Sequence, residues 1–187
     1  MNIEVISGSP RTASQTRRAA IYLQNWLNGN SSHQTGLIDM RDWNLPPVIS
    51  TFTSVEQTPD EFKPLSERIF NADAFILVTP EYNGSYSPVM KNMLDHFPKQ
   101  LHKTVGIVTG SPGSLGGMRA AQQLLLLVPA MFAIASPFLL LIPSIHNKFD
   151  ETGNLVDQSF YATTHTFLTE FLWLAERVNQ EKAGSEK

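Results

Sequence analysis

Short runs of apolar residues, alternating with segments of helical periodicity, place the strongest constraint on the fold of this chain. The clearest runs are Ile3–Ile6, Ala74–Val78, Val105–Val108 and Phe138–Ile142, and Leu37–Asp39 is a weaker one. Nearly continuous apolar strands are typical of a parallel sheet that helices cover on both faces. Strands that alternate with helices favour βαβ units. The sequence therefore predicts an α/β protein with a doubly wound, five-stranded parallel sheet in the order 2-1-3-4-5.

Helix start signals stand in two of the segments between these runs. Thr58–Glu61 has the pattern of a capping box with proline at the first helical position. Ser87 followed by Pro88 repeats such a start. Apolar residues between Phe160 and Val178 recur at three- and four-residue spacing, which predicts a last helix with one face on the core.

Length and composition favour one globular domain over residues 1–187. The chain is 42% apolar and 17% charged, which suits a soluble protein with a sizeable core. Its net charge of −3 gives no reason to expect a nucleic acid or an anionic membrane as partner. No basic segment followed by an apolar signal core precedes the first strand, so we expect a cytoplasmic protein.

Residue types exclude several kinds of site. The chain has no cysteine, which excludes disulfides, thiolate metal sites and thiol redox chemistry. Any redox activity must therefore use a bound cofactor. The histidines lack the spacing of metal ligands, so we predict no metal site. They are His33, His96, His102, His146 and His165.

The apolar segment Leu124–Ile142 is about long enough to cross a membrane. Pro129, Ser136 and Pro137 interrupt it, and its flanks carry no anchor pattern. The segment is better explained as a buried helix end followed by a buried strand.

A turn rich in hydroxyl groups follows the first strand and precedes a helix. It runs from Gly8 to Thr16 and includes Ser9, Ser14 and Arg11. A helix N-terminus has unpaired N–H groups and the positive end of the helix dipole, so it attracts anions. Hydroxyl donors and a planar guanidinium strengthen such a site. The turn lacks the P-loop lysine and the G-x-G-x-x-G pattern, which favours one phosphate group over a triphosphate or a dinucleotide.

Two further loops, Thr79–Ser87 and Thr109–Gly117, follow the next two strongly apolar strands. Because the carboxyl ends of neighbouring parallel strands meet in one crevice, we expect all three loops to lie together. Each loop taken alone is also compatible with an ordinary strand-to-helix turn. Together they offer a phosphate cradle, backbone N–H groups, an amide and an aromatic ring. Flavin mononucleotide (FMN) combines a flat heterocycle with one terminal phosphate and matches this set.

Four motifs carry a resemblance to a known family. They are Gly8–Ser14, Pro80–Ser85, Lys91–Asp95 and Gly110–Arg119, and the likeness runs from residue 2 to about residue 157. The chain resembles the NADPH-dependent FMN reductases, which include azoreductases, quinone reductases and chromate reductases. The resemblance implies a flavodoxin-like three-layer sandwich that forms a single FMN-binding domain, with FMN as cofactor and NADPH or NADH as electron donor.

The resemblance also implies which residues bind the cofactor. The first loop matches the family's phosphate loop, the second lies beside the isoalloxazine ring, and the third lines its far side and begins the next helix. Gln15 stands where the family commonly has asparagine, and it supplies the same amide donors from a longer stem. The implied residues are Ser9, Arg11, Ser14, Gln15, Thr16, Pro80, Glu81, Tyr82, Asn83, Gly84, Ser111, Gly113, Gly116 and Gly117.

The function implied is NAD(P)H oxidation by a ping-pong scheme. The nicotinamide passes hydride to flavin N5, and an acceptor then takes its place: free flavin, a quinone, an azo compound or a metal oxyanion. The flavin carries the chemistry, so no catalytic residue is predicted. The family often forms homodimers and sometimes homotetramers, with the helix at 87–97 near the partner. Two alternatives stay open: an FMN electron carrier, and a flavin-binding sensor without NAD(P)H turnover.

Overall fold

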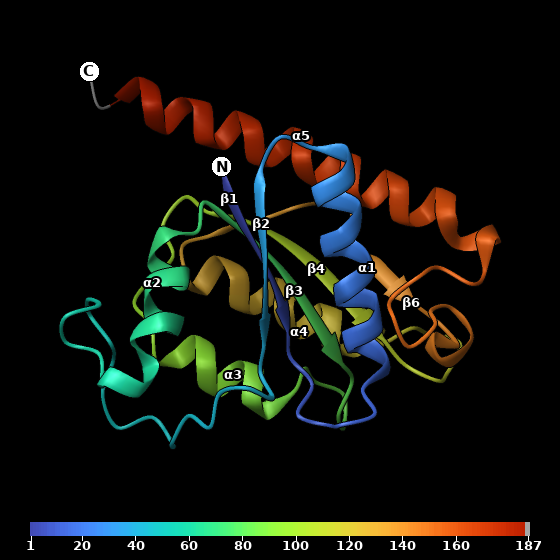
Figure 1. Cartoon of the computed structure of the whole chain (residues 1–187), viewed down its shortest axis with the longest axis horizontal. Coiled ribbons are helices and arrows are strands. Elements are labelled where there is room, and N and C mark those ends of the chain that lie inside the picture. The colour runs from blue at the N-terminus through green and yellow to red at the C-terminus, as the bar shows by residue number, and fades with distance from the viewer. Residues whose placement is uncertain (186–187) are drawn as a thin grey trace.

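A parallel β-sheet forms the centre of the molecule, with helices on both faces (Figure 1). The computed structural model describes the backbone of residues 1–185 and the side chains of residues 1–180. The strands lie in the order β2-β1-β3-β4-β5, and β6 also pairs with β4. This flavodoxin-like arrangement confirms the predicted order. The strands are β1 (Asn2–Ser7), β2 (Gln34–Asp39), β3 (Ala74–Pro80), β4 (Thr104–Gly110), β5 (Ile134–Ala135) and β6 (Leu140–Ile142).

Helices follow the strands as βαβ units require. The α-helices are α1 (Gln15–Asn30), α2 (Lys63–Asn71), α3 (Pro88–Asp95), α4 (Met118–Ala130) and α5 (Tyr161–Ser185). Within residues 1–185, three short 3-10 helices lie in the connections: η1 (Asp60–Phe62), η2 (Ile145–Asn147) and η3 (Gln158–Phe160).

The sheet separates two hydrophobic cores, which makes three layers. Helices α1 and α5 pack on one face, where Phe167 is fully buried. Helices α2, α3 and α4 pack on the other face through residues such as Leu65 and Leu124. Successive strand residues point to opposite faces, so Ile76 and Leu77 of β3 belong to different cores. This two-sided burial explains why the strands are nearly continuous apolar runs.

The predicted strand Phe138–Ile142 is wrong in its extent. Two short strands, β5 and β6, pair with β4 in its place, and the segment between them contains Pro137. Proline has no N–H to donate to a sheet and fixes its own φ, so it interrupts pairing. The chain regains the sheet at Leu140, opposite Val108.

The capping box predicted at Thr58–Glu61 is also wrong. Helix η1 begins at Asp60 without a side-chain cap, and α2 begins only at Lys63. The Thr58 hydroxyl instead donates to the carbonyl of Ser54 and contacts the hydroxyl of Ser66. By contrast, Ser87 caps α3 as predicted, because its Oγ accepts from the backbone N–H of Met90 at 3.3 Å.

Within the described residues, no helix is both long enough and apolar enough to span a membrane. The apolar segment 124–142 divides between the end of α4, a turn and the strands β5 and β6. This agrees with the prediction of a helix end followed by a strand, but the predicted burial is only partial, because Leu126 and Phe138 are exposed.

Candidate functional site

The three predicted loops meet at one edge of the sheet, where the strands end. Ser7 at the end of β1 pairs with Val78 of β3, and Pro80 at the end of β3 pairs with Gly110 of β4. In Figure 1 the connections that follow β1 and β3 lie together at the lower edge of the molecule. A fourth connection joins them, because Gly110 also pairs with Ile142 at the end of β6.

The first loop presents its hydroxyl groups at the start of α1. Ser14 is the N-cap: its Oγ accepts from the backbone N–H of Arg17 at 3.1 Å and lies 3.1 Å from Oγ1 of Thr16. Ser9, Ser14 and Thr16 are all buried. The backbone N–H of Arg11 donates to Oγ of Ser9 at 3.4 Å. The loop therefore gathers hydroxyl groups beside the positive end of a helix dipole.

Helix α3 supports the first loop from behind. The Ser87 hydroxyl donates to the carbonyl of Gly8, and the backbone N–H of Gly8 donates to the carbonyl of Val78 at 2.8 Å. A Cβ on Gly8 would collide with the side chain of Met90. Glycine at this position therefore lets the loop lie directly against α3.

A cavity of about 100 Å³ opens between the first loop and the ends of β3, β4 and β6. Its lining contains no acidic side chain and includes the guanidinium-bearing Arg11. The predicted residues that line it are Ser9, Arg11, Ser14, Gln15, Thr16, Pro80 and Tyr82. The other lining residues, which are not among the predicted cofactor-binding residues, are Ala13, Gly110, Pro112 and Ile145.

Three of these four residues could have been identified as site residues from the sequence, and the fourth could not. Ala13, Gly110 and Pro112 stand inside the loop motifs, so their positions were available from the sequence. Ile145 lies in η2, and its backbone N–H donates to the carbonyl of Ser111 at 3.1 Å. Nothing in its local sequence marks it as a site residue. It reaches the cavity because the chain after β6 folds back onto the third loop.

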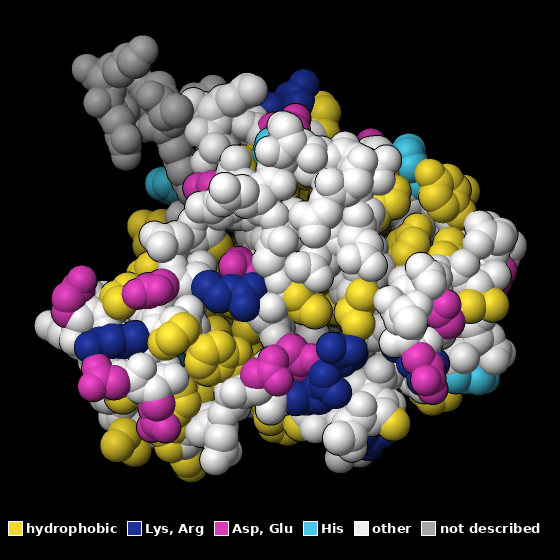
Figure 2. Space-filling model, in the orientation of Figure 1, with side chains coloured by type: hydrophobic (Ala, Val, Ile, Leu, Met, Phe, Trp, Pro, Cys, Tyr) yellow, Lys and Arg dark blue, Asp and Glu magenta, His cyan; other side chains and the backbone are white. Residues whose placement is uncertain are grey.

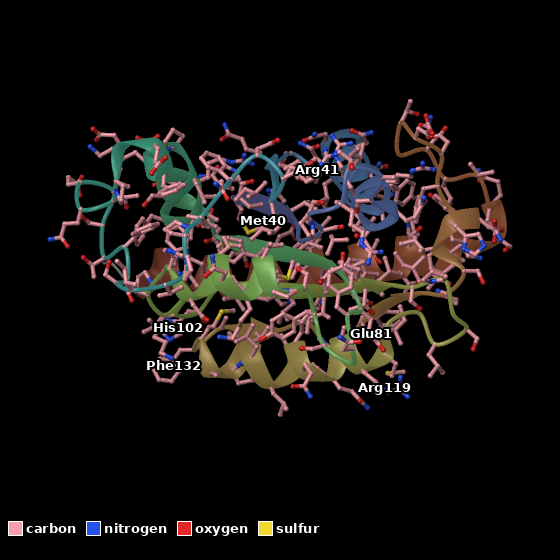
Figure 3. All side chains as sticks on the ribbon, turned by 90° about the horizontal axis from the view of Figure 1, so that it is seen from below. Met40, Arg41, Glu81, His102, Arg119 and Phe132 are labelled. Carbon is pink, nitrogen blue, oxygen red and sulfur yellow. The ribbon has the colours of Figure 1, made fainter. Side chains whose placement is uncertain are left out.

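Glu81 links the second loop to the third. Its Oε2 accepts from the backbone N–H groups of Arg119 at 3.1 Å and Ala120 at 3.4 Å. Its Oε1 lies 3.5 Å from Nη1 of Arg119, and Figure 3 shows the two side chains together at the start of α4. A carboxylate there accepts hydrogen bonds from free helix N–H groups and interacts favourably with the positive end of the helix dipole. The Glu81 carboxylate is thus directed at α4, and Glu81 does not line the cavity.

The second loop ends in a tight turn. Asn83 and Gly84 have φ of 51° and 81°. Tyr82 and Ser85 exchange backbone hydrogen bonds, with N···O distances of 2.8 and 3.1 Å. Two consecutive residues with positive φ are typical of a type I′ turn and favour the Asn-Gly pair. The turn fixes the backbone of Tyr82 beside the cavity.

Close packing within the protein explains why glycine occupies positions 116 and 117 of the third loop. Gly116 and Gly117 have φ of 60° and 85°. A Cβ on Gly116 would lie 2.8 Å from the backbone nitrogen of Ile142, and one on Gly117 would lie 2.9 Å from Cβ of Thr109. Thr109 also donates from Oγ1 to the carbonyl of Gly116 at 2.8 Å. Gly116, Gly117, Asn83, Gly84, Ser111 and Gly113 do not line the cavity.

A charged cluster lies on the outer side of the first loop. Asp39 accepts from Nε of Arg17 at 2.6 Å and from Nη2 of Arg41 at 2.7 Å. Arg41 also donates to the carbonyl of Thr12 at 3.3 Å. In Figure 2, dark blue and magenta side chains adjoin each other at the lower edge of the molecule, near the end of β2. Burial alone would raise the pKa of the Asp39 carboxyl, but hydrogen bonds from both arginines lower it below its usual value.

The Asp39 cluster gives a pH-dependent prediction. Asp39→Asn is expected to lower the free energy of unfolding by about 1–3 kcal/mol near neutral pH, because hydrogen bonds to a charged group are lost. The native pKa lies below the ordinary 3.8, so the contribution is present above that value and is lost as pH falls through the native pKa. The difference between wild type and variant should therefore shrink in acid. Urea unfolding at a series of pH values measures it.

Asp42→Asn, in the exposed turn that follows, is the matched control. A difference between wild type and Asp39→Asn that stayed constant down to low pH would contradict the role given to the Asp39 charge.

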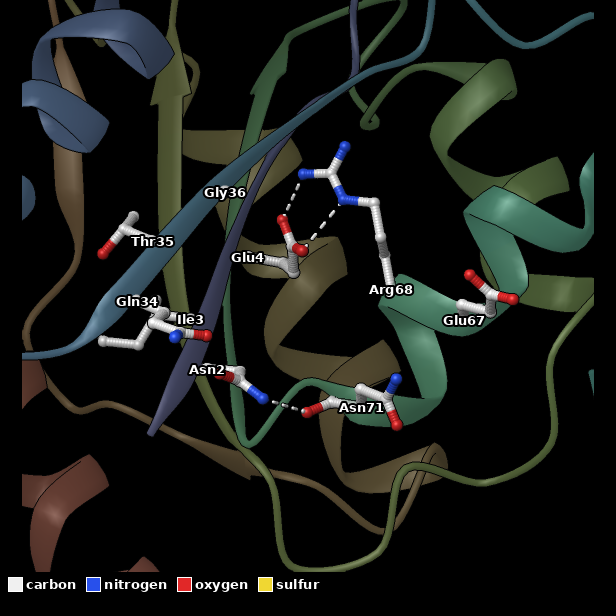
Figure 4. Close-up of a pocket in the computed structure, with 9 residues that line it drawn as sticks. All are labelled: Asn2, Ile3, Glu4, Gln34, Thr35, Gly36, Glu67, Arg68 and Asn71. Carbon is white, nitrogen blue, oxygen red and sulfur yellow. Dashed lines mark hydrogen bonds and ion pairs between the residues drawn. The ribbon is translucent and has the colours of Figure 1, made fainter.

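A larger cavity, of about 400 Å³, lies at the opposite end of the sheet (Figure 4). Its main feature is an ion pair in which Nε of Arg68 donates to Oε1 of Glu4 at 2.9 Å. The pair lies against Gly36, where a Cβ would collide with both side chains. The charges satisfy each other beside the edge strand β2. Because Asn2, Ile3 and Gln34 at the amino ends of β1 and β2 line this cavity, it lies far from the loops that follow the strands.

The residues of the smaller cavity fit the phosphate end of FMN. Oε1 of Gln15 and Oη of Tyr82 are buried without a hydrogen-bond partner, and both residues line this cavity. Buried polar atoms are rarely left unpaired, so these two atoms point to an occupant that supplies partners. The amide oxygen of Gln15 only accepts, so it fits a hydroxyl group of the ribityl chain next to the phosphate. Among the described residues no cluster of histidine, aspartate or glutamate is suited to a metal ion.

Comparisons with known proteins agree with this geometry. The family model for NADPH-dependent FMN reductase matches residues 1–146. An NADPH azoreductase of Bacillus sp. (strain OY1-2) is 27% identical over 155 residues, which covers 82% of this chain and 83% of the relative. An FMN-dependent NADPH-azoreductase of Staphylococcus aureus (strain USA300) is 30% identical over 137 residues, which covers 71% of this chain and 72% of the relative.

Solved structures show the same fold. The flavoenzyme NAD(P)H:(acceptor) oxidoreductase FerB from Paracoccus denitrificans superposes with a TM-score of 0.77 at 21% identity, covering 94% of this chain and 97% of that one. A flavodoxin from Pseudomonas aeruginosa superposes with a TM-score of 0.56 at 16% identity, covering 91% and 99%.

Proposed function

This chain belongs to the NADPH-dependent FMN reductase family, and on that basis we propose that it holds the FMN phosphate in the loop behind β1 and passes electrons to small-molecule acceptors. Its membership and its azoreductase relatives make it an FMN-dependent NAD(P)H oxidoreductase. When bound, FMN supplies the redox chemistry, because its ring takes hydride from a nicotinamide and releases electrons to an acceptor. The protein supplies binding and orientation.

The observation that carries the proposal is the chemistry of the smaller cavity, beside the loop that follows β1. Its lining combines Arg11, hydroxyl groups at the N-terminus of α1 and no acidic side chain. Such a site favours a dianionic phosphate through charge-assisted hydrogen bonds and the helix dipole. The orphaned Oε1 of Gln15 and Oη of Tyr82 would contact hydroxyl groups of the ribityl chain, which FMN shares with riboflavin.

The ring is proposed to lie outside this cavity, across the second and third loops. The backbone N–H groups of Asn83, Gly84 and Gly113 would donate to the acceptor atoms of the ring, whereas those of Tyr82 and Ser111 donate to Ser85 and Ile142 within the protein. Glu81 contributes indirectly, since it fastens the second loop to α4. Donor and acceptor would occupy the same open face in turn, which is the basis of a ping-pong scheme.

Azo compounds are the acceptors best supported, because relatives are described as azoreductases. Free flavin, quinones and metal oxyanions complete the proposed set. The proposal also includes the cytoplasmic location predicted from the sequence and no nucleic-acid partner. Fractionation of the source cells and a binding assay with duplex DNA test these two points.

Titration of the purified protein with FMN, followed by steady-state NADPH oxidation with a panel of acceptors, tests the function. We expect a flavin spectrum, saturable FMN binding in the micromolar range or below, and turnover with an azo dye or a quinone. Absence of FMN binding would overturn the proposal. Binding without NADPH turnover would favour the alternatives of an electron carrier or a sensor.

We also propose that the protein forms a homodimer, or a homotetramer built from it, through the helix at 87–97, which the resemblance places near the partner, and through the outer side of α4 and its flanks. Large apolar side chains are exposed there, with Leu126 at 71% and Phe132 at 61%. A group of exposed apolar residues on one surface is typical of a protein interface. The other members are Leu115, Met118 and Leu125.

Leu126→Glu is expected to shift the protein from dimer toward monomer, because a charge would be buried at the interface. Analytical ultracentrifugation measures the change, and Gln180→Glu, an exposed position on α5 at the other face of the sheet, is the matched control. A monomeric wild-type protein, or a dimer unaffected by Leu126→Glu, would contradict this interface.

A further inference from the structure

A cation–π contact joins the first loop to the second. The guanidinium carbon of Arg11 lies 4.8 Å from the centroid of the Tyr82 ring. Both residues line the smaller cavity, beside the loop that follows β1. Among the described residues no carboxylate forms an ion pair with Arg11, so the ring is the partner that the structure gives its charge. The position of Arg11 thus depends on a residue from a different loop.

The second loop is built to keep this ring in place. Tyr82 is fixed by the reciprocal backbone hydrogen bonds with Ser85 across the turn. Its ring is half-buried and its Oη is fully buried. The hydrogen bonds that fix Tyr82 belong to its backbone, which leaves the face of the ring available to Arg11.

Stacking leaves the hydrogen-bonding edges of a guanidinium free. The five N–H groups of arginine point outward in the plane of the group, whereas the cation–π contact uses its attraction to the ring face. A stacked Arg11 can therefore still donate to a phosphate. An exposed arginine otherwise loses much rotamer freedom when a ligand orders it, and prior stacking reduces that loss.

We propose that Tyr82 is a positioning residue for the phosphate of FMN: its ring holds Arg11 ready at the cavity, so the loop after β3 contributes to phosphate affinity. This inference rests on the proposed function, because it requires the FMN phosphate to bind in the first loop. It gives Tyr82 a role toward the phosphate in addition to its place beside the isoalloxazine ring.

Affinities for FMN and riboflavin, which lacks the phosphate, test the proposal in wild type, Tyr82→Leu, Tyr82→Phe, Arg11→Ala and the double variant Arg11→Ala/Tyr82→Leu. Tyr82→Leu should lower the ratio of FMN to riboflavin affinity about two- to fivefold, as expected for loss of an exposed cation–π contact. Tyr82→Phe keeps the ring, so its ratio of FMN to riboflavin affinity should equal that of wild type. In the Arg11→Ala background, Tyr82→Leu should change that ratio no further.

The outcomes separate this inference from the proposed function. If Arg11→Ala weakens FMN and riboflavin equally, the phosphate does not bind Arg11, and the phosphate assignment fails together with the inference. If Arg11→Ala is selective for FMN but Tyr82→Leu affects both ligands equally, tightens FMN binding or adds fully to Arg11→Ala, the inference alone is overturned. Circular dichroism and thermal unfolding of each variant verify that the affinities refer to folded protein.

Discussion

Replacing Arg11 with alanine is expected to weaken FMN binding about 10- to 150-fold, the effect of losing roughly 1.5–3 kcal/mol from a charge-assisted hydrogen bond. Arg11 is the one arginine in the lining of the smaller cavity, beside the loop that follows β1. Arg17, on the neighbouring helix turn, is instead directed at Asp39. Riboflavin affinity should stay unchanged, because the interaction that is lost involves the phosphate alone. Quenching of flavin fluorescence on titration with protein measures both affinities.

Arg177→Ala is the matched control for this change. Arg177 also stacks on an aromatic ring, that of Trp173 at 4.2 Å, but it lies on α5 away from the loops. Its substitution removes the same charge and the same kind of contact without touching the cavity. An Arg11→Ala variant that binds FMN as tightly as wild type would show that the first loop does not hold the phosphate.

Replacing Gly116 with alanine is expected to lower the free energy of unfolding by about 2–5 kcal/mol. A left-handed backbone costs a residue with a Cβ about 1–2 kcal/mol. The new Cβ would also lie 2.8 Å from the nitrogen of Ile142 and 2.9 Å from that of Pro143, which forces the third loop away from the end of β6. Such crowding adds about 1–3 kcal/mol. Urea unfolding followed by circular dichroism measures the loss.

Gly113→Ala, in the same loop, provides the comparison. Its nearest neighbour would be Oγ of Ser111 at 3.8 Å, an ordinary contact, and Gly113 is not among the glycines with positive φ. We expect a change in stability of no more than about 0.5 kcal/mol there. Similar stabilities for the two variants would contradict the close packing assigned to Gly116.

The parallel sheet was predictable because burial on both faces leaves a direct mark on the sequence. Strand β3, for example, is apolar from Ala74 to Val78 and is buried over that range. The start of α2 was not predictable from the same kind of local signal. Thr58 can cap a helix, but tertiary contacts with Ser54 and Ser66 use its hydroxyl instead. Local propensity is a weak prior when a distant partner competes for the same group.

The candidate site likewise contains residues that could be predicted from the sequence and residues that could not. Residues Ser9 to Thr16 were predictable because a strand end followed by a helix start is itself an anion site. The role of Glu81 at the start of α4 was not, since it depends on how closely the second and third loops approach. The same is true of Ile145, which reaches the cavity only through the fold-back after β6. Contacts between loops require the assembled sheet before they can be recognised.

The central claim is that this chain uses FMN, held by its phosphate behind β1, to take electrons from NADPH. Rapid anaerobic mixing of the FMN-loaded protein with NADPH tests it most directly, with the visible absorbance of oxidised flavin followed in time. We expect complete bleaching in a single turnover, at a rate that saturates with NADPH, and return of the absorbance when an azo dye or a quinone is added. Tightly bound FMN that keeps its oxidised spectrum in excess NADPH would contradict the account.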